Sequence, residues 1–147
     1  MQSNQEVNGQ QAAEEKVLII TCAGTDKALG SVARAIGFNV VEKLRPNTTI
    51  LVGIPPLVAE VKPYSELLKK YPSIIIDGCA ERCATKIAIK NGAKMKGRIF
   101  LPQSVQKYNL KPKTAFDIGP EGEELAEKAA QEIAIQVDKL LGKGKVS

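Results

Sequence analysis

The sequence predicts a three-layer α/β fold in which a mostly parallel sheet carries helices on both faces. Short runs of β-branched and aliphatic residues alternate with segments whose apolar residues recur at helical spacing. The run at residues 73–77 is almost continuously apolar, as expected of a strand that is covered on both faces. Strands and helices succeed one another along the chain, which favours βαβ units and a Rossmann-like or flavodoxin-like arrangement.

Small polar residues, glycines and prolines indicate where these segments begin and end. Thr25 or Asp26 can cap the first helix, and Gly37 can end it because glycine tolerates positive φ. Prolines donate no ladder hydrogen bond, so the pair beginning at Pro55, and later Pro102, are expected to close strands. The expected elements are strands at 16–21, 48–54, 73–77 and 97–101, helices at 28–36, 63–70, 79–91 and 121–141, and a short strand or extended connection at 38–42.

Composition indicates one domain of ordinary size. The chain has 147 residues, of which 44% are hydrophobic and 25% charged, as is typical of globular proteins. Its apolar runs are far shorter than the roughly 18 residues that a membrane-spanning helix needs. The polar N-terminal segment does not resemble a signal peptide. We expect a disordered tail at 1–15, a single α/β domain at 16–142 and a loose tail at 143–147, in a cytoplasmic protein without a membrane partner.

Charge and the absence of histidine limit the possible functions. The net charge is +5, and without histidine any chemistry must use Cys, Asp, Glu, Lys or Arg. From Arg82 to Lys113 there are nine basic residues and no acidic one, with Lys86, Lys90 and Lys94 continuing a four-residue repeat from Arg82. Such a stripe can attract nucleic acid or an acidic partner. No aromatic residues interleave with it, so a solvated face is favoured and specific nucleic-acid binding is not expected.

The three cysteines are the main functional clue. Cys22 and Cys79 follow two predicted strands, and ligands bind at the edge where parallel strands present their carboxyl ends. In a reducing compartment, cysteines are more often metal ligands or nucleophiles than disulfide partners. On one helix, Cys79 and Cys83 would have β-carbons roughly 5–6 Å apart. This spacing suits zinc–sulfur bonds better than a disulfide, so a facile Cys79–Cys83 disulfide is not expected.

The order of these motifs resembles a known family. Asp-Gly-Cys at 77–79 ends an apolar strand, Cys83 follows four residues later, and Cys-Ala-Gly at 22–24 ends an earlier strand. This pattern resembles the DGC-domain family, and the resemblance covers residues 16–141. It implies a small cytoplasmic α/β protein with four characteristic cysteines proposed to bind zinc.

This chain departs from the family pattern because it has three cysteines. The missing one is expected near residues 52–54, where this chain has only apolar residues and glycine. Asp26, Asp77, water or a substrate could complete a three-thiolate site, and an open fourth position is typical of catalytic zinc. Asp77 is as well placed to cap the following helix. The resemblance therefore predicts a zinc ion, with Cys22, Cys79, Cys83 and Asp77 as its candidate ligands.

The same residues allow two other interpretations. Cys79, near a helix N-terminus and close to Arg82, could be the nucleophile of a thiol-dependent redox or transfer enzyme, with Cys22 or Cys83 resolving the intermediate. Cysteines can also be small buried core residues without chemistry. The sequence identifies neither a reaction nor an oligomeric state, and a small molecule or protein partner is expected without being specified.

Overall fold

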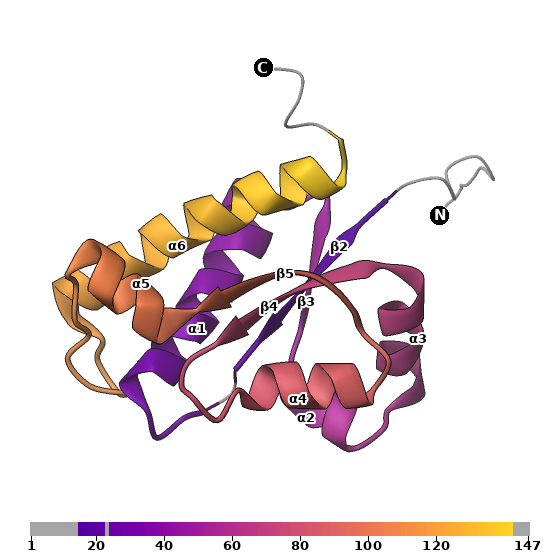
Figure 1. Ribbon diagram of the computed structural model, residues 1–147, viewed down its shortest axis with the longest axis horizontal. Coiled ribbons are helices and arrows are strands. Elements are labelled where there is room, and N and C mark those ends of the chain that lie inside the picture. The colour runs from indigo at the N-terminus through magenta and orange to yellow at the C-terminus, as the bar shows by residue number, and fades with distance from the viewer. Residues whose placement is uncertain (1–14, 23, 143–147) are drawn as a thin grey trace.

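The sheet has the predicted parallel topology. The computed structural model describes residues 15–22 and 24–142, and in them four parallel strands pair in the order β3-β2-β4-β5 (Figure 1). The predicted tails at 1–15 and 143–147 lie outside these ranges, apart from Glu15. The strands are β2 (Val17–Thr21), β3 (Thr49–Val52), β4 (Pro72–Asp77) and β5 (Lys94–Phe100).

Helices cover both faces of this sheet, which confirms the three-layer α/β fold (Figure 1). One layer contains α1 (Ala28–Phe38), the π-helix η2 (Asn39–Leu44), α5 (Leu101–Tyr108) and α6 (Gly119–Leu140). The other contains α2 (Ile54–Val58), α3 (Lys62–Lys70) and α4 (Cys83–Lys90). In the described part of the chain, no helix combines the length and apolar character needed to cross a membrane.

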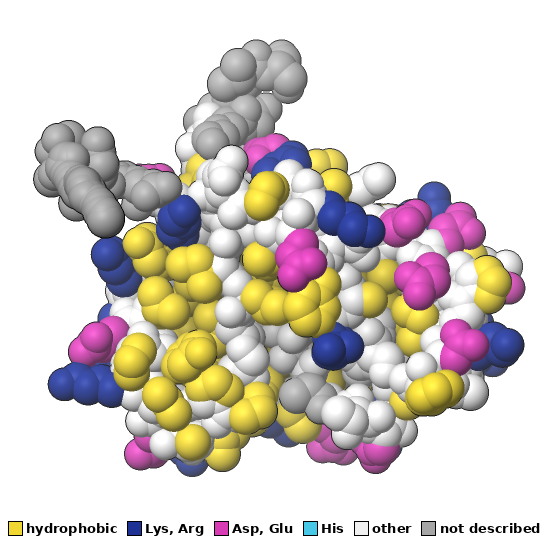
Figure 2. Space-filling model, turned by 180° about the vertical axis from the view of Figure 1, so that it is seen from behind, with side chains coloured by type: hydrophobic (Ala, Val, Ile, Leu, Met, Phe, Trp, Pro, Cys, Tyr) yellow, Lys and Arg dark blue, Asp and Glu magenta, His cyan; other side chains and the backbone are white. Residues whose placement is uncertain are grey.

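The alternation of side chains along β2 divides the core into two halves. Val17 and Ile19 pack under α1 and α6, whereas Leu18 and Ile20 pack under α2, α3 and α4. All four are fully buried, as expected for a central parallel strand. The core beneath the α2–α4 layer has fewer buried residues than the core beneath the α1–α6 layer. Figure 2 shows hydrophobic side chains gathered over the region of α2 and α3, where Val58 is 62% exposed.

The topology creates a switch point between β2 and β4. The chain leaves β2 to form β3 on one side, then crosses back to form β4 on the other side of β2. The loops that follow β2 and β4 therefore diverge into opposite layers. The backbone N–H of Cys22 donates to the carbonyl of Ile76 at 2.9 Å, which extends the pairing to this edge. Open α/β sheets bind ligands in the crevice formed at such a point.

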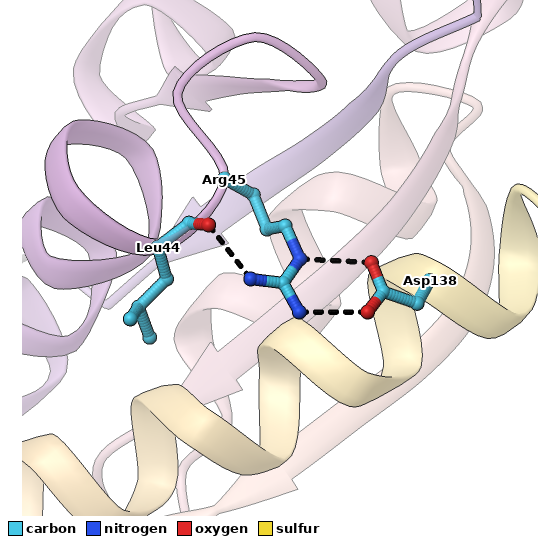
Figure 3. A network of polar contacts seen from close by, with 3 residues as sticks. All are labelled: Leu44, Arg45 and Asp138. Atoms are coloured by element: carbon cyan, nitrogen blue, oxygen red, sulfur yellow. Dashed lines mark hydrogen bonds and ion pairs between the residues drawn. The ribbon is translucent and has the colours of Figure 1, made fainter. Parts of the chain in front are cut away.

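Arg45, which lies between η2 and β3, forms a bidentate ion pair with Asp138 of α6 (Figure 3). Its Nε and Nη2 donate to the two carboxylate oxygens of Asp138 at 2.8 and 2.6 Å. Its Nη1 donates to the carbonyl of Leu44 at 2.7 Å. The hydrogen bond to Asp138 raises the pKa of the Arg45 guanidinium. This bidentate ion pair links two segments that are far apart in the sequence, on the α1–α6 side of the sheet.

Several boundaries predicted from the sequence are wrong. The segment at 38–42 is helical, because α1 continues into η2. Gly37 does not end α1 and serves close packing, since a β-carbon there would lie 2.7 Å from Thr21 Cγ2. The N-cap of α1 is Lys27, and neither Thr25 nor Asp26 caps it.

Two prolines start helices where strand ends were predicted. Pro55 and Pro102 lie in the first turns of α2 and α5, where a proline loses no hydrogen bond. The strand expected at 97–101 is β5, which begins at Lys94 and gives way to α5 at Leu101.

Candidate functional site

A cavity of about 310 Å³ opens at the switch point between the carboxyl ends of β2 and β4. Cys22 contributes from the loop after β2, and Cys79 and Cys83 contribute from the chain after β4. All three predicted cysteines therefore line one cavity. The remaining lining residues are Gly24, Asp26, Lys27, Gly30, Ile54, Gly78 and Glu81.

The loop after β2 is held by the packing of backbone on backbone. A β-carbon on Gly30 would lie only 2.0 Å from the carbonyl oxygen of Gly24, so the first turn of α1 rests directly on this loop. Gly78 makes a similar approach, because a β-carbon there would lie 3.1 Å from the Leu29 carbonyl group. The backbone N–H of Gly24 donates to Cys22 Sγ at 3.4 Å. This bond holds the Cys22 sulfur at the wall of the cavity.

The chain after β4 differs from the sequence prediction, which placed a helix at 79–91. Helix α4 begins at Cys83, and residues 79–82 form a turn that the Arg82 N–H closes by donating to the Cys79 carbonyl at 3.0 Å. Arg82 has φ 55° and ψ 46°, a left-handed conformation that interrupts the helix. Cys79 and Cys83 consequently do not share a helical face. The stripe of basic residues is also broken, since Lys94 lies in β5.

Asp77 is fully buried and caps α4 from a distance. Its Oδ1 accepts the backbone N–H of Thr85 at 3.2 Å, and its Oδ2 accepts the Thr85 hydroxyl. No side chain at the N-cap position, Arg82, serves this end of α4. The Asp77 carboxylate thus satisfies a donor of the first helical turn, as an N-cap side chain would. Asp77 does not line the described cavity, and its role as a zinc ligand stays a prediction.

The Arg82 guanidinium stacks on Phe100 and does not line the cavity with the cysteines. Its Cζ lies 4.1 Å from the centroid of the Phe100 ring. Its Nη1 is buried and finds no hydrogen-bond acceptor within the described ranges. The hypothesis of a nucleophilic Cys79 relied on Arg82 being close to the sulfur. The structure gives that guanidinium a packing role between α4 and β5.

The donor chemistry of the cavity fits zinc, whereas the side chains as they stand do not form a closed site. Thiolates are soft ligands that select zinc, and three thiols from two loops face one cavity. Within residues 15–22 and 24–142, no three Cys, Asp or Glu side chains are arranged to hold a metal ion together. A shared ion would require the cysteine side chains to converge further.

Sequence reasoning overlooked Gly30, and it considered residues 52–54 only as the expected position of the missing family cysteine. An isolated glycine within a helical pattern can signal close packing, and Gly30 is such a residue. Ile54 follows β3 and lines the cavity. It lies at residues 52–54, where the fourth family cysteine was expected. An apolar side chain therefore occupies this position at the cavity wall.

The fold and the cavity together define a class of protein: a small three-layer α/β domain with a cysteine-lined cavity at its topological switch point. The family model of the DGC domain matches residues 18–133, and the chain belongs to this family. No curated protein and no solved structure matches the chain.

Proposed function

We propose that this protein binds a zinc ion in the switch-point cavity through the thiolates of Cys22, Cys79 and Cys83. The observation that carries the proposal is that all three cysteines of the chain line this one cavity. Zinc suits the site because thiolates are soft ligands that zinc binds in tetrahedral sites. The Gly24 N–H that donates to Cys22 Sγ supplies the kind of outer-shell hydrogen bond that orients a metal ligand.

Three thiolates leave one position of a tetrahedral site for another ligand. Ile54 offers no donor on its side of the cavity, and the Asp77 carboxylate is occupied by Thr85. Asp26 lines the cavity and is exposed, so it competes with water or a substrate for this position. A zinc ion with an exchangeable position acts as a Lewis acid towards a bound small molecule. The cavity is large enough for a small molecule beside the ion.

Zinc content and affinity test the proposal. Protein purified without chelator or histidine tag should contain about one zinc per chain, and competition with a chromophoric chelator at fixed pH gives its affinity. Cys22→Ser, Cys79→Ser and Cys83→Ser should each weaken binding by more than about 100-fold, because even outer-shell changes cost about 10–100-fold. Asp26→Asn is the matched control within the same cavity and should have a smaller effect.

Folding must be followed in the same variants, because a lost ligand and a lost fold both lower zinc affinity. Far-UV circular dichroism of each metal-free serine variant should match that of the metal-free parent. Full zinc affinity in a folded Cys22→Ser variant would exclude Cys22 and with it a site that joins the two loops.

A second candidate is thiol redox chemistry in the same cavity, and the turn at 79–82 favours it. The expectation that Cys79 and Cys83 resist disulfide formation depended on an intact helix between them, and α4 begins only at Cys83. Glutathione disulfide would oxidise the two thiols to one disulfide and be reduced to two glutathione molecules. Mass spectrometry of metal-free protein would detect this bond. Its rapid, reversible formation with α4 retained would favour a thiol oxidoreductase over a resident zinc site.

A further inference from the structure

Within residues 15–22 and 24–142, one face of the edge strand β5 has no helix packed along it, apart from the stack of Arg82 on Phe100. On the side of α2, α3 and α4, helix α4 packs on β4 and β2, and α3 packs on β4. The other side of β5 is closed by α6, since a β-carbon on Gly97 would lie 2.2 Å from the Gln136 side chain. Figure 1 shows β5 beside β4 at the end of the sheet. The α2–α4 layer therefore stops one strand short.

Strand register identifies the side chains on this open face. Arg98 pairs with Ile75, which belongs to the core beneath α2, α3 and α4. Met95 pairs with Ser73, which in turn pairs with Leu18 of the same core. Side chains of paired residues project from the same face of a sheet. Met95 and Arg98 therefore lie on the open face, and both are exposed.

The flank of α4 that faces β5 is apolar and basic. Thr85 marks this flank, because it bonds to Asp77, whose register partner is Phe100 of β5. Ile89 lies one turn further along the same flank and is 49% exposed, with Lys86 three residues before it. We call the combined feature the α4–β5 surface; it consists of Lys86, Ile89, Met95 and Arg98, with Lys96 in the irregular stretch of β5 between Met95 and Arg98.

The cations of this surface have no partners in the described structure. Arg45 and Lys107 pair with Asp138 and Glu132, whereas no ion pair within residues 15–22 and 24–142 involves the cations of the α4–β5 surface. Edge-strand lysines can serve only to prevent strands from pairing. That role explains Lys96 but neither the helical Lys86 nor the exposed Ile89 and Met95 in its vicinity. An apolar strip between unpaired cations fits a specific partner better.

We propose that the α4–β5 surface docks an acidic, amphipathic helix of a partner protein, which completes the α2–α4 layer over β5. The apolar stripe of such a helix would cover Ile89 and Met95, and its carboxylates would meet Lys86 and Arg98. A second copy of this chain is a poor occupant, because its net charge is +5 and a two-fold contact would oppose like charges. Nucleic acid would use the cations and leave the apolar strip uncovered.

A pair of synthetic peptides tests the chemistry of the partner. The first is an amphipathic helix of about 18 residues with leucine on one stripe and glutamate on its flanks. The second has lysine in place of every glutamate. Fluorescence anisotropy in about 0.1 M salt should show binding of the glutamate peptide only, and this binding should weaken as salt rises. No binding of the glutamate peptide up to about 1 mM would overturn the proposal.

Matched charge reversals test the location. Arg98→Glu and Lys86→Glu should each weaken peptide binding by about 10-fold or more. Lys43→Glu changes the net charge equally but lies in η2, in the helical layer on the opposite side of the sheet, and should change binding by less than about 2-fold. Equal losses in all three variants would show attraction by net charge alone and overturn the surface.

Ile89→Ser separates a protein partner from nucleic acid. It should weaken binding of the glutamate peptide by about 10-fold, because the apolar contact is lost, and leave any binding of single-stranded DNA unchanged. DNA that binds more tightly than the peptide, and is lost in Arg98→Glu, would assign the surface to nucleic acid instead. These side chains are exposed, so circular dichroism should show every variant to be folded.

Discussion

The two loops that meet at the switch point are held in different ways. The loop after β2 is fixed by contact between backbones, because the first turn of α1 rests on Gly24 where Gly30 has no side chain. Beyond Gly78, which itself lies against the Leu29 backbone, the chain after β4 is fixed by side chains, with Asp77 bonded to Thr85 and Arg82 stacked on Phe100. A close contact between backbones leaves no room for an added atom. Side-chain contacts can be lost one at a time, each with a limited effect on stability. The cysteine of the first loop should therefore be placed more rigidly than those of the second.

Gly30→Ala should have the largest effect on this arrangement. Its β-carbon would meet the Gly24 carbonyl oxygen at 2.0 Å, and backbone cannot rotate away as a side chain can. We expect the free energy of unfolding to fall by at least about 3 kcal/mol, although alanine raises helix propensity by about 1 kcal/mol. Urea unfolding measures this, and zinc affinity should fall too because Gly24 bonds to Cys22 Sγ.

Gly53→Ala is the matched control, because Gly53 follows β3 at the same edge of the sheet. Its φ of −85° suits alanine, and its β-carbon would meet nothing closer than 3.7 Å. The change in stability should stay within about 1 kcal/mol. A similar small change in Gly30→Ala would show that α1 can move away from the loop, and the contrast between the two loops would be lost.

The same contrast explains what could be predicted from the sequence. Continuous or periodic apolar residues identify the buried strands and the long α6. The three-layer fold, and the sheet edge shared by Cys22 and Cys79, therefore follow from the sequence pattern. The conformation of the chain after β4 could not be predicted in this way. Residues 79–91 have helical spacing, and no glycine or proline marks the turn at 79–82. The left-handed Arg82 is stabilised by tertiary contacts with Phe100, which lies in another element. The spacing of apolar residues along the sequence does not reveal such a tertiary contact.

Asp77→Ala should lower the free energy of unfolding by an intermediate amount, because it removes a contact that holds the chain after β4. It leaves the partly buried Thr85 N–H without an acceptor, and we expect a loss of about 1–3 kcal/mol in the free energy of unfolding. Asp77→Asn keeps an oxygen acceptor and should retain most of the stability. Urea unfolding and chelator competition should be measured on both variants. A large loss of zinc affinity in Asp77→Asn, at nearly unchanged stability, would identify Asp77 as a metal ligand and contradict a purely structural role.

The smallest effects should come from the stack of Arg82 on Phe100. Phe100→Leu keeps an apolar side chain but removes the ring, and should cost about 0.5–1 kcal/mol of stability beyond the loss of buried area. Arg82→Gly loses the same stack but relieves a left-handed backbone, worth about 1–2 kcal/mol, so its net change should be close to zero. A double-mutant cycle isolates the coupling of the two residues. Neither side chain lines the cavity, so zinc affinity should be unchanged in both variants. A loss of about 2 kcal/mol or more in Arg82→Gly would show that the guanidinium holds the turn at 79–82 more firmly than a cation–π contact can, and the second loop would then be as rigid as the first.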